Sequence, residues 1–471
     1  MKKEHIKNIA LAVLVIMNLV LGSKILIDEK LWPSGYNFFN VENFPIFNMF
    51  LKDNKDAENF EKASHLTMPE KIIFNTGDQT TRFPLNSNNK DYSSVVGYCN
   101  EILVMALSAD EGRIYEISKD EWFSSLMTKS IYLSYYTEYE TELFAKFLGV
   151  RETELSKKAD LFSNVVISLS DNVSVSFEDK NEDKYYRIKT GKRFEEFKNT
   201  VENIIASSAQ NIEGNAINYS FDLNFDKVFG TQKAIIDSMV PIYSNTQLLP
   251  VISAYQPVDF SDDGVIDDIV HTFNVNANVA RRYTEADGTM VYVENNAKLK
   301  IHTNGMIEYT ATEKGIPLLD ASGGHNVISE ANKFIGELAK ASRSNVNMYL
   351  SSPAKEGENV ITFDYIAEGM PVNIYLNDKK NNAVTCVVSD GYIKEYRHIL
   401  RGYKSTGEYF VTPEYIMAVD ETIQKYSDVT GEITMNKLYL AYNDNGNNQN
   451  LIADWNTEVE AVILENKEGQ E

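Results

Sequence analysis

Three short segments carry the residue types of a serine acyl-transfer site. Ser352-Pro-Ala-Lys355 fits S-x-x-K, Ser170-Asp171-Asn172 is S-D-N, and Lys189-Thr190-Gly191 is K-T-G. In enzymes built on these motifs the serine attacks, the lysine takes its proton and K-T-G lines the substrate strand. Here the nucleophile motif comes last instead of first, and Ser352 lies in a polar loop. An acyl-transfer enzyme is therefore the least favoured of three candidate functions.

A second group, Asp267, Asp268 and His271, has the i, i+4 spacing that brings metal ligands together on a helix. We predict instead that residues 271–279 form a strand, because Phe273, Val275, Ala277 and Val279 alternate with polar residues. A strand would separate these side chains. The chain also lacks a P-loop, G-x-G-x-x-G after a strand, H-E-x-x-H and G-x-S-x-G. The sequence thus predicts no enzyme, no catalytic residues, no metal and no cofactor.

The elements that would position these groups indicate an α+β protein. Helical spacing predicts helices at 91–106, 140–148 and 194–205, and 172–177 with 184–189 read as a strand pair. Strands dominate after residue 216, and a further helix is expected at 329–342 with Ser329 as its N-cap.

Two hairpin patterns resemble each other in the second half of the chain. KIHTNGMIEYTA (300–311) and VVSDGYIKEYRH (387–398) each place Asn-Gly or Asp-Gly between strands and continue to Glu-Tyr. Such dipeptides favour tight hairpins because both turn residues tolerate positive φ. The later copy has one extra residue before its Glu-Tyr. We interpret the pair as two related α+β modules in tandem, with antiparallel sheets.

The composition excludes several classes of protein. With 45 basic and 68 acidic residues, a net charge of −23 disfavours nucleic acid and anionic lipid surfaces as partners. Two cysteines exclude a disulfide scaffold. Cys99 lies on an apolar helical face and Cys386 in a strand-like run, so both are expected to be buried.

The N-terminus has the pattern of a membrane anchor. Residues 6–27 form an apolar run whose length of about 33 Å as a helix spans a hydrocarbon core of about 30 Å. Lysines cluster before this run, which predicts a cytoplasmic N-terminus and an extracytoplasmic bulk. A cleaved signal peptide is the alternative, with Val20 and Gly22 before the cleavage point. The apolar continuation at 25–27 favours the uncleaved anchor.

One stripe of the predicted anchor combines small and polar residues. Small groups let membrane helices approach, and an asparagine near mid-membrane needs a hydrogen-bonding partner. We therefore predict a contact with another membrane helix, although Asn18 in a passive anchor is an open alternative. The predicted partner-binding stripe consists of Asn8, Ala12, Val15, Asn18 and Gly22.

Several segments in order resemble the YycH regulatory proteins of Gram-positive bacteria. The exit from the anchor reads LWPSGYNFF (31–39), and residues 273–309 resemble the second extracellular domain of that family. The segments FDYIAEGMPVNIYL (363–376), VSDGYIKEYRHIL (388–400) and ITMNKLYLAYNDNGNNQNLIADW (433–455) resemble its third domain, which is also similar to YycI. The resemblance extends over the whole chain and rests on order and spacing.

The resemblance implies a non-catalytic regulator of a sensor histidine kinase that controls cell-wall metabolism, the WalK–WalR or YycG–YycF two-component system. It implies a YycI-like membrane protein and the kinase as partners, and a homodimer is a further candidate association. An extracellular ligand sensor, with a pocket between modules lined by some of the 27 tyrosines, is the first alternative.

The expected architecture is one transmembrane helix followed by an elongated, multi-domain extracellular α+β part. Its predicted divisions are a cytoplasmic tail (1–5), the membrane helix (6–27), a first extracellular domain (32–215), a second (216–325), a third, YycI-like domain (326–462) and a flexible tail (463–471).

Overall fold

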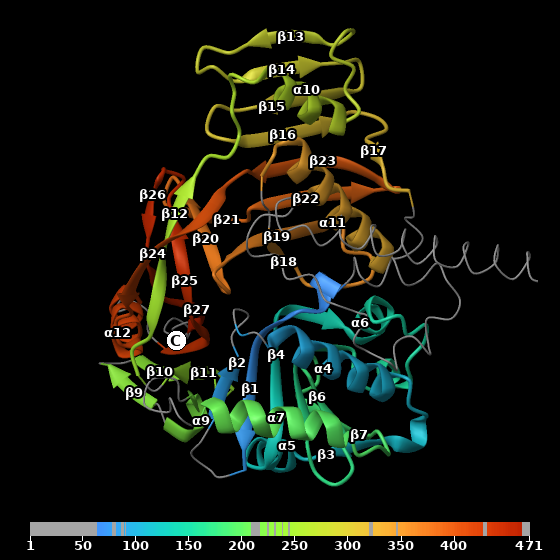
Figure 1. Cartoon of the computed structure of the whole chain (residues 1–471), viewed down its shortest axis with the longest axis vertical. Helices are drawn as coiled ribbons and strands as arrows, with labels where there is room; N and C mark the ends of the chain where they lie inside the picture. The colour runs from blue at the N-terminus through green and yellow to red at the C-terminus, as the bar shows by residue number, and fades with distance from the viewer. Residues whose placement is uncertain are drawn as a thin grey trace, which may run out of the picture. The chain divides into compact units, whose positions relative to one another are not determined.

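The computed structural model describes residues 64–463 apart from 78–81, 86–88, 90, 209–216, 224–225, 230–231, 238, 244, 320–323, 345–346 and 427–430. The described chain is α+β, as predicted, and Figure 1 shows its strands and helices in chain order. The predicted segments 1–5 and 6–27, and residues 464–471 of the predicted tail, lie outside the described residues. The positions of the domain boundaries stay a prediction.

The first half of the chain builds a seven-stranded antiparallel sheet. Its strands lie in the order β2 (Arg82–Leu85), β1 (Pro69–Thr76), β4 (Lys129–Glu140), β5 (Leu161–Ser168), β6 (Ser174–Asp179), β7 (Lys184–Lys189) and β3 (Ile114–Ile117). Its helices are α4 (Tyr92–Leu107), α5 (Lys119–Leu126), α6 (Thr141–Phe147) and α7 (Glu195–Ser208). The predicted helices at 91–106, 140–148 and 194–205 and the predicted strand pair are therefore confirmed.

Both faces of this sheet are covered. Val165 and Val166, adjacent on β5 and pointing to opposite faces, are both fully buried. Trp122 of α5 packs on one face against Tyr132 and Val166. Cys99 of α4 is buried, as is Cys386 in the other large sheet, so both cysteines behave as the small apolar side chains that the sequence predicts.

The second half contributes most of a fifteen-stranded sheet. One part contains β13 (Arg281–Thr284), β14 (Met290–Val293), β15 (Ala297–Ile301), β16 (Met306–Ala311), β23 (Tyr392–Ile399), β22 (Val384–Ser389), β19 (Val360–Ala367) and β18 (Met348–Leu350), in that spatial order. The path continues from β19 through β20 (Met370–Leu376), β25 (Gly431–Asp444), β10 (Gln232–Ile236) and β9 (Asp226–Phe229). β17 (Ile316–Pro317), β21 (Lys379–Asn381) and β27 (Ala453–Ile463) pair at its sides.

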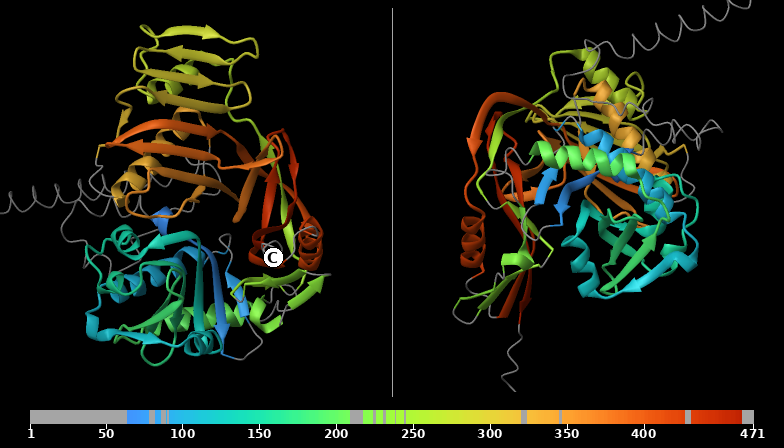
Figure 2. Two further views of the ribbon diagram at one scale, coloured as in Figure 1. Left: turned by 180° about the vertical axis from the view of Figure 1, so that it is seen from behind. Right: turned by 60° about the horizontal axis from the view of Figure 1, so that its bottom comes forward.

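Smaller elements complete the described fold. A three-stranded sheet has the order β24 (Gly402–Val411), β12 (Leu248–Tyr255) and β26 (Gln449–Leu451). β8 (Ile217–Tyr219) pairs with β11 (Pro241–Tyr243), and the remaining helices are α9 (Ser220–Leu223), α10 (Asp263–Thr272), α11 (Gly324–Ala341) and α12 (Tyr415–Lys425). Short 3-10 turns lie at Ser64–Thr67, Glu111–Arg113 and Glu154–Lys157. Figure 2 shows the same elements from two further directions.

Eight strands of the fifteen-stranded sheet are arranged about an approximate twofold axis that passes between β16 and β23. In spatial order they are β13, β14, β15, β16, β23, β22, β19 and β18. One helix and the strands β13, β14, β15 and β16 follow each other in the chain, and then a helix and β18, β19, β22 and β23 repeat this order. The two copies meet where β16 pairs with β23, and there Tyr309 faces Tyr396, Glu308 faces Arg397 and Thr310 faces Glu395. This is the arrangement that a tandem duplication predicts. The β20–β21 hairpin is an insertion in the second copy only.

Aromatic packing holds α10 and α11 on one face of these strands. Phe273, which follows α10, lies 5.3 Å from Phe334 of α11, 5.4 Å from Tyr309 and 5.6 Å from Tyr396, measured between ring centroids. The opposite face carries the alternate residues of the same strands. The extra residue of the later hairpin is a β-bulge, because Val387 faces Glu395 while Val388 faces Ile393 and leaves Lys394 unpaired.

Two sequence predictions are wrong in this region. Residues 271–279 do not form a strand: α10 covers 263–272, and Asn274 ends it with a φ of 56°. The reason lies upstream, where the Asp262 carboxylate caps the helix and Val265, Ile266, Ile269 and Val270 bury one face. Ser329 is not an N-cap either, since α11 begins at Gly324 and the Ser329 hydroxyl donates to the His325 carbonyl within the helix.

The Asn304-Gly305 turn gives a first testable prediction. Gly305 has a φ of +89°, and an added Cβ would lie 2.5 Å from Gln256 Nε2 and 2.9 Å from the Leu400 carbonyl oxygen. Gly357 has a φ of +78° with nothing within 4 Å. Both Gly→Ala changes incur the same backbone strain, so Gly305→Ala is expected to lose about 1 to 3 kcal/mol more than Gly357→Ala, from overpacking alone. Urea unfolding of the two variants measures this difference, and equal losses would contradict it.

Candidate functional site

The three acyl-transfer motifs do not converge. The Ser352 hydroxyl accepts a hydrogen bond from the Thr362 amide, and the neighbouring Ala354 bridges to Tyr139 at the end of β4. Tyr139 pairs with Phe162 at the start of β5, whereas Ser170 follows the far end of that strand. The eight residues of β5 span roughly 26 Å at about 3.3 Å per residue. Ser352 therefore cannot attack a substrate held by the other two motifs.

The candidate metal ligands Asp267, Asp268 and His271 all lie on a helix, although a strand was predicted to begin at residue 271. Asp267, Asp268 and His271 are all exposed on α10. Within the described part of the chain, no three histidine, cysteine, aspartate or glutamate side chains are grouped as metal ligands. Two exposed side chains at i, i+4 spacing make at most a weak site.

Direct contacts join the seven-stranded sheet to the fifteen-stranded one. Tyr136 of β4 stacks on Tyr349 of β18 with ring centroids 3.9 Å apart. The Ala354 amide donates to the Glu138 carbonyl, and the Glu140 amide donates to the Ala354 carbonyl, each at 2.9 Å. These contacts fix β4 against the loop that follows β18.

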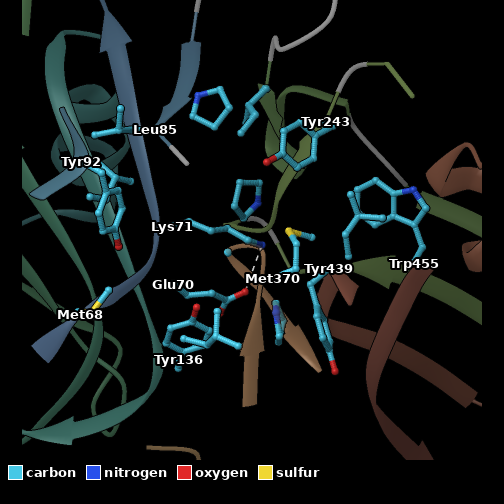
Figure 3. A pocket seen from close by; sticks show the side chains of 18 of the residues that line it. Met68, Glu70, Lys71, Leu85, Tyr92, Tyr136, Tyr243, Met370, Tyr439 and Trp455 are labelled. Carbon is cyan, nitrogen blue, oxygen red and sulfur yellow. Dashed lines mark ion pairs between the residues drawn. The ribbon is translucent and has the colours of Figure 1, made fainter. Parts of the chain in front are cut away.

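A small pocket lies beside these contacts (Figure 3). Tyr92 and Tyr136 line it from the seven-stranded sheet and its helix, and Tyr439 and Trp455 line it from β25 and β27. Its volume is about 80 Å³. Sites for small organic ligands are usually about 300 to 1,000 Å³, so this tyrosine-lined pocket has room for a few water molecules and not for such a ligand. This tyrosine-lined pocket is therefore too small to be the ligand pocket that the sensor alternative predicts.

The electrostatics of the pocket also disfavour chemistry there. Lys71 Nζ lies 3.7 Å from Glu70 Oε1. Burial lowers the pKa of Lys71, with a smaller contribution from Lys437, while Glu70 acts in the opposite direction. Burial first, and then the Glu70 charge, raise the pKa of Tyr136 well above its usual value. The tyrosine hydroxyls thus stay protonated, and the pocket is a packed contact between two sheets.

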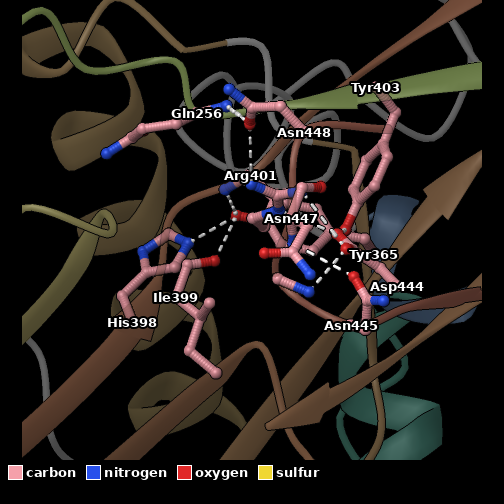
Figure 4. Close-up of polar contacts among 11 residues, drawn as sticks. Gln256, Tyr365, His398, Ile399, Arg401, Tyr403, Asp444, Asn445, Asn447 and Asn448 are labelled. Carbon is pink, nitrogen blue, oxygen red and sulfur yellow. Dashed lines mark hydrogen bonds and ion pairs between the residues drawn. The ribbon is translucent and has the colours of Figure 1, made fainter. Parts of the chain in front are cut away.

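A buried ion pair lies at the junction of β23, β24 and β25 (Figure 4). The side chains of Arg401 and Asp444 are 1% and 0% exposed. Arg401 Nε and Nη2 donate to the two carboxylate oxygens at 2.8 and 3.2 Å, a bidentate arrangement. The Tyr403 hydroxyl and the Gly446 amide also donate to Asp444, at 2.9 and 2.8 Å.

The same arginine fixes the loop after β25. Its Nη2 donates to the Asn447 carbonyl at 2.5 Å and its Nη1 to Asn448 Oδ1 at 3.4 Å. Asn448 Oδ1 also accepts the Gln256 amide at 3.0 Å. The ion pair therefore holds residues 445–448 in one conformation against the sheet.

His398 extends this network into the helix-covered core. The Tyr365 hydroxyl donates to the Ile399 carbonyl at 3.1 Å, so it accepts from His398 Nε2 at 2.9 Å. His398 Nδ1 then accepts from the Tyr396 hydroxyl at 3.0 Å, and these partners assign the neutral Nε2–H tautomer. Burial lowers the pKa of His398 to about 3.

Sequence reasoning missed this network. Arg401 and Asp444 are 43 positions apart, and His398 has no neighbour at a metal-like spacing. The available signal was the run Asp444-Asn-Gly-Asn-Asn directly after an apolar strand. Such a run predicts a turn, but its buried charge partner depends on strand pairing.

The predicted partner-binding stripe of Asn8, Ala12, Val15, Asn18 and Gly22 lies outside the described residues. Among the residues that the structure describes, no helix combines the length and the apolar character needed to cross a membrane.

The fold has a solved counterpart. The crystal structure of YycH from Bacillus subtilis aligns with a TM-score of 0.55 at 8% sequence identity, covering 86% of this chain and 97% of that one. No protein-family model matches the sequence, and no curated protein matches it either. The chain therefore has a YycH-like fold, and the resemblance predicted from the order of its segments is confirmed at that level.

Proposed function

We propose that this protein is a non-enzymatic, membrane-anchored regulator that modulates a sensor histidine kinase of a two-component system controlling cell-wall metabolism. The observation that carries the proposal is the YycH-like fold, which extends over 86% of the chain and nearly the whole of the neighbour. Fold alone does not specify function, so the proposal also draws on the segments that resemble the YycH regulators.

The described residues support a binding role more than a chemical one. The serine motifs are separated along β5, and the pocket between the large sheets has a volume of about 80 Å³. Its tyrosines have raised pKa values, Tyr243 to about 12, because they are buried. These features support the proposed action through contacts with other proteins.

The proposed contacts involve both the anchor and the extracellular part. The N-terminus is proposed to be cytoplasmic, with residues 6–27 in the membrane and the bulk outside the cell. The stripe that contains Asn18 would face a helix of the kinase or of a YycI-like protein. There an asparagine amide can find a hydrogen-bond partner that lipid does not supply.

Asn18→Leu tests this contact. Interhelical hydrogen bonds in membranes contribute about 1 to 2 kcal/mol in model peptides, so association is expected to weaken about tenfold. The measurement is co-purification of the full chain, in detergent, with the sensor kinase and the YycI-like protein of the same cell.

The matched control is Ile16→Leu, which lies two positions away and hence roughly on the opposite side of a helix. It should leave association unchanged. If Asn18→Leu associates as well as the parent chain, the stripe is not the contact. If the parent chain itself recovers no kinase, the regulatory function is wrong.

A further inference from the structure

The sheet face opposite α10 and α11 carries a polar row across the twofold axis. Lys300, Glu308, Arg397 and Thr385 face each other in register on β15, β16, β23 and β22. Their strand neighbours Tyr309 and Tyr396 point to the helix side, where they contact Phe273. Because side chains alternate along a strand, this row lies on the face that the helices leave uncovered.

A groove of about 560 Å³ is formed on this face. That volume lies within the range of about 300 to 1,000 Å³ that is usual for small-ligand sites. Its floor is the β16–β23 pair, and its walls are the β20–β21 turn and the loop after β25. The lining residues are Asn304, Met306, Glu308, Leu376, Asn377, Lys379, Asn381, Arg397 and Asn445.

Both walls are held in place before any ligand arrives. The β20–β21 turn has positive φ at its two central residues, Asn377 (52°) and Asp378 (59°), the conformation of a tight hairpin. Asn445 follows Asp444, whose carboxylate binds the buried Arg401 guanidinium and the Gly446 amide. A preorganised wall reduces the entropy that binding costs.

The charges in the groove favour an anion. Arg397 and Lys379 are its two cations and Glu308 is its one carboxylate. Glu308 is already engaged, with its Oε2 2.8 Å from His302 Nε2. Arg397 Nη2 donates to Asn381 Oδ1 at 2.8 Å, and its Nε is buried, so a ligand in the groove meets the Nη end of the guanidinium. In a chain of net charge −23, two cations against one engaged carboxylate make this a local cationic site.

The uncharged side chains of the groove favour a ligand that carries hydroxyl groups in addition to its negative charge. Four asparagines line the groove, at 304, 377, 381 and 445. The Oδ1 atoms of Asn304 and Asn445 accept backbone amides, and Asn381 bonds to Arg397 and to the Lys379 carbonyl. The amide NH2 groups of Asn304, Asn377 and Asn445 are the donors that suit hydroxyl groups of a ligand. Met306 and Leu376 add apolar surface for C–H groups. A guanidinium fork matches the geometry of a carboxylate.

We propose that this groove binds a small polyhydroxylated carboxylate, of the size and chemistry of one acidic sugar unit. Arg397 and Lys379 bind the carboxylate, and the asparagines bind the hydroxyl groups. This site is separate from the proposed kinase contact, and binding is measured on the protein alone, so either proposal can fail without the other.

The test is to titrate D-glucuronate into the full-length protein in detergent and to measure the heat of binding by calorimetry. A dissociation constant on the order of 1 mM is expected, which corresponds to about 4 kcal/mol. D-Glucose has the hydroxyl groups without the charge, and acetate has the charge without the hydroxyl groups. Both should bind at least about tenfold more weakly, because a hydrogen bond to a charged group contributes about 1.5 to 3 kcal/mol.

Lys379→Met should weaken glucuronate binding about tenfold, and its exposed position at the start of β21 leaves the fold intact. Lys404→Met removes an exposed lysine on β24, outside the groove, and should change nothing. Arg397→Lys keeps the charge but removes the fork, and it should also weaken binding. The proposal is wrong if glucuronate does not bind, if glucose or acetate binds equally well, or if the two lysine variants behave alike.

Discussion

Replacing Asp444 by asparagine is expected to lower the free energy of unfolding by about 3 to 5 kcal/mol. The substitution preserves the size of the side chain but removes its charge. The Arg401 guanidinium, 1% exposed, then lies buried without its counter-ion. The Tyr403 hydroxyl and the Gly446 amide also lose their charged acceptor. A buried charge left alone costs far more than an exposed ion pair contributes.

Hydrogen exchange read by mass spectrometry locates this loss. Amides of β23 and β25 should exchange faster in Asp444→Asn, while those of β4 and β5 in the seven-stranded sheet should change little. The control is the double variant Arg401→Met with Asp444→Leu. Since it removes both charges together, it should recover much of the stability. A single variant as stable as the parent would show that the pair contributes little.

The second large effect is an acid sensitivity that depends on His398. This residue is 0% exposed and its pKa is lowered to about 3 by burial, whereas a histidine in the unfolded chain has a pKa of about 6.5. Between these values the unfolded state binds a proton that the folded state excludes. The contribution to stability is complete above the unfolded pKa and is lost as the pH falls toward the folded one.

The size of the loss follows from linkage. Each pH unit in this window costs about 1.4 kcal/mol, so the full interval amounts to roughly 5 kcal/mol. His398→Gln keeps an amide that can donate to Tyr365 and accept from Tyr396, but it does not titrate. Unfolding by urea between neutral pH and pH 4 should therefore give a shallower pH dependence for the variant than for the parent. Parallel curves would show that His398 does not cause the sensitivity.

Local patterns predicted much of the fold. The hairpins at 300–311 and 387–398 were correct because their turns need positive φ, which Gly305 and Gly391 supply. The extra residue noticed in the second copy is the bulge at Lys394. The prediction failed at 271–279, where apolar alternation begins but a helix capped by Asp262 has already set the conformation.

The candidate sites depend on contacts that a sequence does not show. Arg401 follows β23 and Asp444 ends β25, two strands of one sheet that are separated by β22, β19 and β20. Arg397 and Asn381 were unremarkable in sequence, and only the pairing of β23 with β22 and β16 brings them to a groove. The predicted membrane stripe that contains Asn18 differs from these sites, because the helical spacing of its residues alone predicts it.

The insertion between β19 and β22 determines how many ligands one chain can hold. A dimer of identical modules would carry the same insertion twice and present two equivalent grooves, because symmetry repeats every change. In this chain the two modules are covalently joined, so their association needs no threshold concentration and each copy is free to diverge. The β20–β21 hairpin belongs to one copy, and the groove that it borders occurs once. Saturating titration should therefore reach one ligand per chain.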